Sequence, residues 1–355
     1  MIPEIFKKRP VIIAGPCSAE TEAQTIETCQ RLAATGRVDV LRAGVWKPRT
    51  RPGGFEGVGL PALPWMIEAK RLTGLPVAVE VATAKHVQSA IEFGVDILWI
   101  GGRTTVNPFS VQEIADALRG SKVTVLIKNP LNPDMELWGG AVARVMNAGV
   151  DPSHIGLIHR GFSYFGHSKY RNAPMWHVAL EMRSRFPDLA MICDPSHICG
   201  RRDNLLEVAQ QAADMNFDGL MIESHISPDT ALSDAAQQVV PEDFDKIVSA
   251  IRWRKESANN PEFVESLNKH RNAIDQIDSE LFELLGRRMD IAEQIGQIKR
   301  DNDVAILQGE RWSSIVGKSV AQASKLRLSE DFMRTILEAI HIESINRQNE
   351  VMNRQ

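Results

Sequence analysis

Residues 38–51 read Val-Asp-Val-Leu-Arg-Ala-Gly-Val-Trp-Lys-Pro-Arg-Thr-Arg, an apolar run followed directly by a basic loop. Four cations, Arg42, Lys47, Arg49 and Arg51, lie within this loop, and Pro48 stiffens it. A basic loop that leaves a buried strand contributes little to a core, but it is well suited to hold phosphate or carboxylate groups. A solvated surface loop is the alternative interpretation, because charged runs usually face water.

The apolar run at 38–41 is one of eight such runs. They are rich in Val and Ile, lack polar alternation and are bounded by Gly, Pro or Asp, as is typical of parallel strands buried on both faces. Amphipathic stretches such as 84–93 and 111–118 lie between them. Eight strand-then-helix repeats predict the α/β class and a closed (β/α)8 TIM barrel. A doubly wound open sheet is the alternative, weakened because no Gly-x-Gly-x-x-Gly follows the first run. The runs are 11–14, 38–41, 77–81, 97–100, 123–127, 155–158, 190–193 and 219–222.

The composition excludes several classes of protein. The chain has 355 residues, 43% hydrophobic and 24% charged, with a formal net charge of −4, which does not suit a general nucleic-acid or membrane-surface binder. No apolar run approaches the roughly 18 residues of a membrane span, and the first residues do not resemble a signal peptide. Four cysteines in so long a chain do not form a disulfide framework, so we expect a reducing cytoplasm.

The periodicity changes after residue 252, which we take as the end of the barrel domain. Residues 253–262 form a polar linker, and residues 263–355 form a purely helical domain. A heptad seam predicts one helix of nearly forty residues, roughly 55 Å long, followed by helices near 309–323 and 329–352. So long a helix cannot bury its seam alone, so we expect a homodimer. The seam consists of Ile274, Leu281, Arg288 and Ile295, and of Ile277, Leu284, Ile291 and Ile298.

Four candidate metal ligands lie just after predicted strands. Cys17 is found in Ala-Gly-Pro-Cys-Ser, His197 in Cys-Asp-Pro-Ser-His, Glu223 at the end of the last run, and Asp234 in the following loop. The carboxyl ends of the strands are where a barrel builds its active site. Thiolate, imidazole and carboxylate together suit Mn, Fe, Co or Zn better than Mg or Ca. Taken singly, Cys17 could be a small core residue and His197 an ordinary loop histidine.

Five cations follow the same rule of placement. Unpaired charge beside a buried barrel is costly. Salt bridges to Glu80, Asp194 or Glu223 could satisfy one or two of the cations, but not all five. The surplus therefore indicates a strongly anionic substrate. The five cations are Arg42, Lys47, Arg103, Lys128 and Arg160.

The motifs of residues 1–252 resemble those of 3-deoxy-D-arabino-heptulosonate-7-phosphate (DAHP) synthase of type I-beta. The resemblance implies condensation of phosphoenolpyruvate with erythrose 4-phosphate, the first step of the shikimate pathway to the aromatic amino acids. It implies a divalent metal, Mn²⁺ first with Co, Fe or Zn as alternatives, on Cys17, His197, Glu223 and Asp234. It assigns phosphoenolpyruvate to Arg42, Lys47, Arg103, Lys128 and Arg160, and erythrose 4-phosphate to Arg49 and Thr50. The motifs are Gly15-Pro16-Cys17-Ser18, Lys47-Pro48-Arg49-Thr50, Gly101-Gly102-Arg103, Asp194-Pro195-Ser196-His197 and Ile222-Glu223-Ser224-His225.

Lys47 is the expected proton donor of this reaction. The sequence departs from the family pattern after Thr50, where Arg51-Pro52-Gly53-Gly54-Phe55 replaces a Ser-Pro start. The related synthase that makes 3-deoxy-octulosonate 8-phosphate from arabinose 5-phosphate is an alternative, although its phosphate loop usually differs from Lys-Pro-Arg-Thr.

The helical half carries its own cations. Arg288 occupies a seam position, where a buried arginine needs an anion, and Lys299 lies about 20° around the helix on the same face. Arg271 lies roughly 100° away from Arg288 and would serve another pocket, that of a partner chain. Ser344 and Gln348 are four residues apart and face one side. Alternatively, Arg288 extends to solvent.

Residues 263–355 resemble the AroQ-type chorismate mutase. The resemblance places Arg271, Arg288, Lys299, Gln308, Arg311, Ser344 and Gln348 at positions that bind chorismate or prephenate. Arg288, Lys299 and Gln348 would act in catalysis. The sequence departs from the family at Gln308, where aspartate is common, and at Trp312, where glutamate is usual.

Two roles of the helical half stay open. It could be an active mutase that also mediates feedback inhibition of the barrel by prephenate or chorismate. It could instead be a catalytically weak domain for dimerisation or sensing. In either case the expected partners are small molecules and a second copy of the chain, not nucleic acid or membrane.

Overall fold

Eight parallel strands close into a barrel in sequence order in this computed structural model. The structure describes residues 4–49, 53–165, 168–255, 257, 260–307 and 309–353. The first strand pairs with both the second and the eighth, so the predicted closed barrel is confirmed and the open-sheet alternative is wrong. The strands are β1 (Val11–Gly15), β2 (Val40–Ala43), β3 (Val77–Val81), β4 (Ile97–Ile100), β5 (Thr124–Lys128), β6 (Ile155–His159), β7 (Ala190–Cys193) and β8 (Gly219–Glu223).

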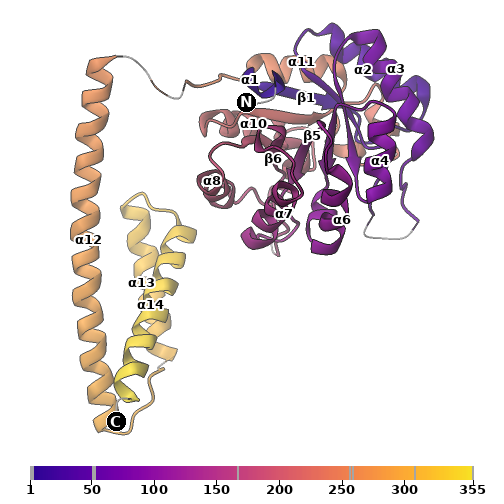
Figure 1. Ribbon diagram of the computed structural model, residues 1–355. Coiled ribbons are helices and arrows are strands. Elements are labelled where there is room, and N and C mark those ends of the chain that lie inside the picture. Colours follow the sequence, from indigo (N-terminus) through magenta and orange to yellow (C-terminus); the bar gives the residue numbers. More distant parts are fainter. Residues whose placement is uncertain are drawn as a thin grey trace. The chain divides into compact units, whose positions relative to one another are not determined.

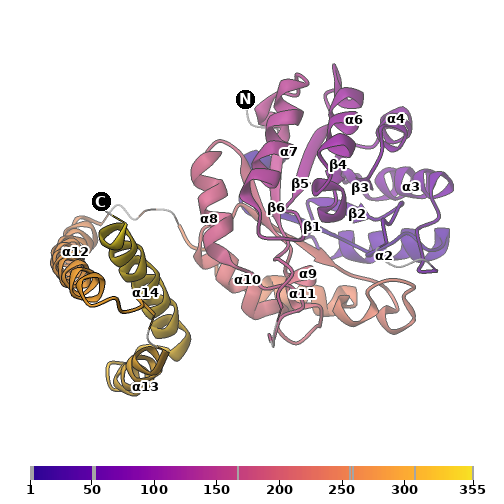
Figure 2. The same cartoon turned by 90° about the horizontal axis from the view of Figure 1, so that it is seen from below.

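Helices surround the strands, as the view in Figure 2 shows. Short 3-10 segments lie at Leu60–Ala62, Pro152–His154, Pro228–Thr230 and Ala235–Gln237. The α-helices of the barrel unit are α1 (Glu4–Lys7), α2 (Glu22–Ala34), α3 (Leu63–Thr73), α4 (Ala84–Glu92), α5 (Gly102–Thr105), α6 (Pro108–Leu118), α7 (Met135–Asn147), α8 (Trp176–Arg185), α9 (Pro195–Cys199), α10 (Leu205–Asp214) and α11 (Pro241–Ala250).

Two hydrophobic layers hold the barrel together. An inner cluster fills the barrel with side chains from all eight strands, including Trp99, Leu126 and Met221, and Phe6 of α1 joins it. A larger outer cluster packs the strands against the helices. Since apolar side chains fill the barrel, the charged side chains of the strands gather at the carboxyl ends.

Strand β2 begins two residues later than predicted. Asp39, inside the predicted run, turns its carboxylate to the backbone N–H of Ile12 (2.9 Å) and to the Lys8 ammonium. The strand then runs on through Arg42, whose side chain is fully buried. An apolar run read from the sequence ends at its first charged residue, here Arg42. In the structure Arg42 is paired with Glu223 inside the barrel, so β2 continues to Ala43.

The helical unit comprises α12 (Pro261–Asp301), α13 (Gly309–Lys325) and α14 (Glu330–Met352). Contacts between Cα atoms divide the chain into Met1–Glu256 and Ser257–Gln355. Helix α12 begins inside the expected linker, because the Asn260 side chain caps it by accepting from the N–H groups of Glu262 and Phe263, with Pro261 in the first turn.

Helices α12 and α14 run side by side (Figure 1), and Ala292 and Gly296 of α12 are buried there. Most of the predicted seam is uncovered in the single chain, with Ile277 and Ile298 each 63% exposed. Among the described residues, no helix is long and apolar enough to cross a membrane.

Candidate active sites

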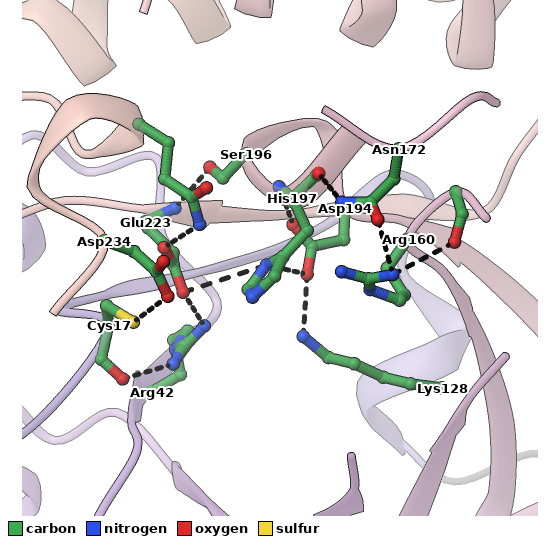
Figure 3. A network of polar contacts seen from close by, with 12 residues as sticks. Cys17, Arg42, Lys128, Arg160, Asn172, Asp194, Ser196, His197, Glu223 and Asp234 are labelled. Carbon is green, nitrogen blue, oxygen red and sulfur yellow. Dashed lines mark hydrogen bonds and ion pairs between the residues drawn. The ribbon is translucent and has the colours of Figure 1, made fainter. Parts of the chain in front are cut away.

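Three of the four predicted metal ligands meet at the carboxyl end of the barrel (Figure 3). Cys17 follows β1, Glu223 ends β8, and Asp234 lies in the loop that leads to α11. One ligand atom from each lies within 4.8 Å of the others, and the Cys17 Sγ is 3.3 Å from Asp234 Oδ2. Cys17 and Glu223 are fully buried. Closure of the barrel thus brings together residues more than two hundred positions apart.

The fourth predicted ligand, His197, lies beside this cluster. Its Nδ1 is 3.8 Å from Glu223 Oε1 and 2.8 Å from Asp194 Oδ2. Asp194 caps α9 by accepting from the His197 N–H (3.0 Å), which fixes the histidine against the strand ends. Burial lowers the pKa of His197, and the nearby Asp194 only partly offsets this. The imidazole is therefore neutral near pH 7, the form that binds metals.

The donor set fits a divalent metal ion. Burial, and then the charge of Glu223, raise the pKa of the Cys17 thiol to about 12, because a thiolate there would face carboxylates in a dry site. A bound cation reverses this balance and allows the thiol to ionise. Sulfur, nitrogen and oxygen donors in one cluster are the combination that Mn, Fe, Co and Zn accept.

The predicted cations surround a cavity that reaches the same cluster. It is lined by Lys47, Arg49, Arg103, Lys128 and Arg160, together with His197 and Asp234. These residues come from the ends of several different strands. The cavity can therefore hold an anion directly beside the candidate metal ligands.

Contacts between described residues give at least three of the five predicted anion-binding cations a carboxylate partner, more than the one or two expected. Arg42 Nη1 lies 3.0 Å from Glu223 Oε1, Lys47 Nζ 3.5 Å from Glu80 Oε2, and Lys128 Nζ 2.7 Å from Asp194 Oδ2. In a buried barrel end, a charge without a partner costs more than a pair does, so each strand-end carboxylate is used.

Arg42 differs from the other cations because it does not line the cavity. Its side chain is fully buried, its Nη2 donates to the Cys17 carbonyl (2.9 Å), and its guanidinium lies 4.6 Å from the centre of the Trp99 ring. Arg42 therefore braces two candidate ligands, Cys17 and Glu223.

Two asparagines support Arg160 and were not predicted. Asn129 Oδ1 accepts from the Arg160 N–H (2.6 Å), and Asn172 Oδ1 accepts from its guanidinium (3.1 Å). Burial lowers the pKa of Arg160 to about 10, so the side chain stays charged at neutral pH. Asn129 directly follows Lys128 and could have been found from its place at a strand end. Asn172 lies in the long loop before α8, where the sequence offers no signal.

Some predicted residues lie outside the described part of the chain. Thr50 and Gln308 are among them, as are the side chains of Arg311 and Trp312. Arg49 is described: its Nε donates to the Phe55 carbonyl (2.8 Å) and its Nη1 lies 3.8 Å from Asp234 Oδ2.

A second pocket, of about 340 Å³, lies in the helical unit. Four of its lining residues were predicted: Arg288, Lys299, Ser344 and Gln348. The Arg288 guanidinium donates to the Ser344 hydroxyl, and Lys299 donates to the Ile306 carbonyl. Arg288 is exposed in the single chain, not buried, because the seam around it is uncovered, yet its side chain turns to Ser344.

Arg271 is exposed and does not line this pocket.

Barrel, cavity and helical pocket define a class of protein: a (β/α)8 barrel with a cation-lined cavity at the carboxyl ends of its strands, joined to a helical unit that has a second pocket. Residues 6–258 match the DAHP synthetase I family, and the chain belongs to that family. Residues 270–349 match chorismate mutase type II.

Relatives of known identity match the barrel. Phospho-2-dehydro-3-deoxyheptonate aldolase of Thermotoga maritima is 31% identical over 241 residues, covering 68% of each chain. The crystal structure of the Thermotoga maritima DAHP synthase matches with a TM-score of 0.60 at 30% identity, over 67% of each chain. A 2-dehydro-3-deoxyphosphooctonate aldolase of Rhodopseudomonas palustris is 29% identical over 264 residues, covering 68% of this chain and 86% of that one.

The two family memberships make the chain a bifunctional enzyme of the shikimate pathway. The barrel is a 3-deoxy-7-phosphoheptulonate synthase, and the helical unit is a chorismate mutase.

Proposed function

We propose that the barrel condenses phosphoenolpyruvate with erythrose 4-phosphate at a divalent metal held by Cys17, His197, Glu223 and Asp234. The observation that carries the proposal is the shared cavity, which joins His197 and Asp234 to four of the cations assigned to phosphoenolpyruvate. When bound, the metal supplies Lewis acidity for the aldehyde oxygen of the sugar phosphate. Mn²⁺ is the ion that we expect, with Co, Fe or Zn as alternatives.

The cations orient the substrates in this proposal. Lys47, Arg103, Lys128 and Arg160 hold phosphoenolpyruvate from the cavity wall, and Arg42 adds a fifth positive charge from its buried position against Glu223. Arg49 and Thr50 hold the phosphate of erythrose 4-phosphate. The enol carbon then attacks the aldehyde carbon, and the developing alkoxide takes a proton. Water adds to the oxocarbenium-like carbon that this attack creates, and phosphate leaves from that carbon to give the product ketone.

Lys47 is the proton donor in this scheme. Burial opposes its protonation, but the carboxylate of Glu80 and, where it is ionised, the thiolate of Cys17 outweigh burial and raise the pKa of Lys47 above its usual value. The ammonium form is therefore present at neutral pH and can protonate the new alkoxide.

Metal removal tests the site. Chelation should abolish condensation and Mn²⁺ should restore it, whereas Cys17→Ala should stay inactive even with added Mn²⁺. Cys29→Ala is the matched control, since Cys29 is equally buried but lies in α2. Full activity of Cys17→Ala, or of the metal-stripped enzyme, would contradict the ligand assignment.

A second assay tests the sugar phosphate. Condensation with erythrose 4-phosphate and not with arabinose 5-phosphate separates DAHP synthesis from synthesis of 3-deoxy-octulosonate 8-phosphate.

We also propose that the mutase pocket works by positioning alone. Arg288 and Arg311 hold the carboxylates of chorismate, with Ser344 and Gln308 at the same site, and Arg271 reaches in from the partner of a homodimer. Lys299 and Gln348 hydrogen-bond the ether oxygen as charge grows on it. Loss of mutase activity in Arg288→Ala with unchanged helicity supports this. A wild-type enzyme without mutase activity would instead favour a dimerisation or sensor domain.

Finally, we propose feedback from the helical unit to the barrel in a cytoplasmic enzyme. The motivation is the fusion of a later pathway activity to an earlier one on a single chain. Prephenate or chorismate bound by the helices would restrain condensation. Truncation after Lys255 should then relieve inhibition by prephenate. Equally strong inhibition of the truncated barrel would contradict the proposal.

A further inference from the structure

An arginine and a glutamine that play no part in the mechanism above link the two carboxylates of the metal cluster. Arg171 lies in the loop before α8, and its Nη1 donates to Asp234 Oδ1 (2.8 Å) and to Gln237 Oε1 (2.9 Å). Gln237 in turn donates through Nε2 to Glu223 Oε2 (2.7 Å). The chain of contacts runs from one candidate ligand to the other through Arg171 and Gln237.

The orientation of the Gln237 amide is fixed by its two neighbours. Its oxygen faces a guanidinium, which only donates, and its NH₂ group faces a carboxylate, which only accepts. A flipped amide would lose both hydrogen bonds. Gln237 is 1% exposed, so water cannot replace them.

The bridge occupies one oxygen of each carboxylate. Arg171 takes Oδ1 of Asp234, and the other oxygen, Oδ2, lies 3.3 Å from Cys17 Sγ. Gln237 takes Oε2 of Glu223, whose Oε1 lies toward Arg42 and His197. The bridge therefore decides which oxygen of Asp234 faces Cys17.

The surrounding backbone is built to hold this arrangement. Gly200 leaves room for Arg171, since a Cβ on Gly200 would collide with the Arg171 side chain. Asp234 has a left-handed backbone (φ 47°), uncommon outside glycine. Its loop is tied on the other side by hydrogen bonds from Leu232 N–H to Glu20 (2.8 Å) and between Ser233 and Ser18.

We propose that Arg171 and Gln237 are positioning residues that hold Glu223 and Asp234 in a metal-binding geometry and so set the affinity of the barrel for its metal. The inference rests on the proposed metal site. Groups that hydrogen-bond metal ligands orient them, and their loss typically weakens metal binding about 10- to 100-fold. The effect should therefore appear in metal affinity before it appears in the affinity for either substrate.

The test measures Mn²⁺ affinity of the metal-stripped full-length enzyme by competition with a chelating dye. Arg171→Ala and Gln237→Met should each bind Mn²⁺ about 10- to 100-fold more weakly than wild type. At saturating Mn²⁺, their KM values for both substrates should stay near those of wild type. Arg201→Ala is the matched control, since Arg201 is a nearby exposed arginine that pairs with Asp203, and it should bind Mn²⁺ as wild type does. Circular dichroism and Tm verify folding.

The double variant sharpens the test. Since the two residues act in one bridge, losing both should weaken binding by less than the product of the single effects.

Unchanged Mn²⁺ affinity in both folded variants would overturn the inference. So would a raised KM for erythrose 4-phosphate with unchanged Mn²⁺ affinity, because Arg171 would then bind substrate. A wild-type enzyme that binds no Mn²⁺, Co²⁺, Fe²⁺ or Zn²⁺ would overturn the proposed metal site itself. Gln237→Met decides the matter if Arg171→Ala does not fold.

Discussion

Gly44 is a residue at which one added methyl group would disturb both a candidate metal ligand, Cys17, and the candidate proton donor, Lys47. A Cβ there would lie 2.5 Å from the Cys17 carbonyl oxygen and 2.5 Å from Cδ of Lys47. Only glycine lets the chain after β2 pass between them, so it fixes a candidate ligand and a candidate proton donor together.

We therefore expect Gly44→Ala to lower kcat/KM for condensation about 100-fold, because a shift near 1 Å at a catalytic group has about this cost. Steady-state kinetics at saturating Mn²⁺ measure the effect. Gly140→Ala is the control, since nothing lies within 4 Å of a Cβ at that position, and it should leave the rate unchanged. A Gly44→Ala enzyme with wild-type kinetics would show that Lys47 tolerates displacement.

His159 makes barrel stability depend on pH. It ends β6 and its ring packs near those of Phe162, Trp176 and Phe217. Burial lowers its pKa to about 3, against an ordinary 6.5 in the unfolded chain. The unfolded chain thus binds the proton more tightly, so this group takes stability away as pH falls from 6.5 toward 3.

His159→Leu removes this titration. Relative to the variant, the wild-type barrel should lose up to about 1.4 kcal/mol of unfolding free energy per pH unit between pH 6 and pH 4. Urea unfolding at several pH values, followed through the barrel transition, gives the difference. His177→Leu, at an exposed position on α8, should keep the wild-type pH dependence. Parallel pH profiles of wild type and His159→Leu would contradict this account.

At the residue scale, the site residues that could be predicted from the sequence are those at the carboxyl ends of strands. Lys47, Arg103, Lys128 and Arg160 could be placed together because parallel strands in a barrel all end at the same rim. Arg171 and Gln237 could not, because they lie in long loops whose path depends on tertiary contacts. Arg42 was placed at the right rim, but its complete burial depends on its pairing with Glu223, which no spacing in the sequence shows.

At the scale of elements, the contact between α12 and α14 shapes the mutase pocket. A Cβ on Gly296 would lie 3.0 Å from the Cα and 3.2 Å from Cγ of Gln348. Gly296 therefore permits the close approach that brings Gln348 into the pocket beside Lys299.

Gly296→Val should push α14 away and lower mutase activity by at least 10-fold while condensation by the barrel is largely kept. A displacement of about 1 Å is enough for such a loss. Gly286→Val, on the same helix with nothing within 4 Å of its Cβ, makes the same change in helix propensity and should keep mutase activity. Equal losses of mutase activity in the two variants would point to a general effect of valine on α12 and contradict the role of the α12–α14 contact.

The elements themselves were largely predictable. Strands β3, β4 and β7 begin and end where the apolar runs do, because Gly, Pro or Asp bounds them. The start of α12 was missed by two residues, since Asn260-Pro261 looks like a linker but acts as a helix cap and first turn. Capping depends on one side-chain contact, which composition does not reveal.

For the whole molecule, the uncovered seam of α12 is the feature that a single chain leaves unexplained. Ile274, Ile277, Leu281, Leu284 and Ile298 are exposed along it. An apolar stripe of this length at heptad spacing is typical of a helix that pairs with another helix. A homodimer would cover it and would bring Arg271 of one chain toward the pocket of the other.

Complementation between two inactive variants tests this arrangement. Arg271→Ala and Arg288→Ala should each lose mutase activity. In a heterodimer of the two, one pocket combines the intact Arg288 of one chain with the intact Arg271 of the other, whereas the second pocket lacks both. Heterodimers isolated with two different affinity tags should therefore recover about half of the wild-type mutase rate, as a twofold-symmetric dimer requires.

The control pairs Arg288→Ala with Lys299→Ala, two residues that line the same pocket within one chain, and should recover nothing. If the Arg271–Arg288 heterodimer is as inactive as this control, Arg271 acts within its own chain or not at all, and the exposed seam needs another explanation.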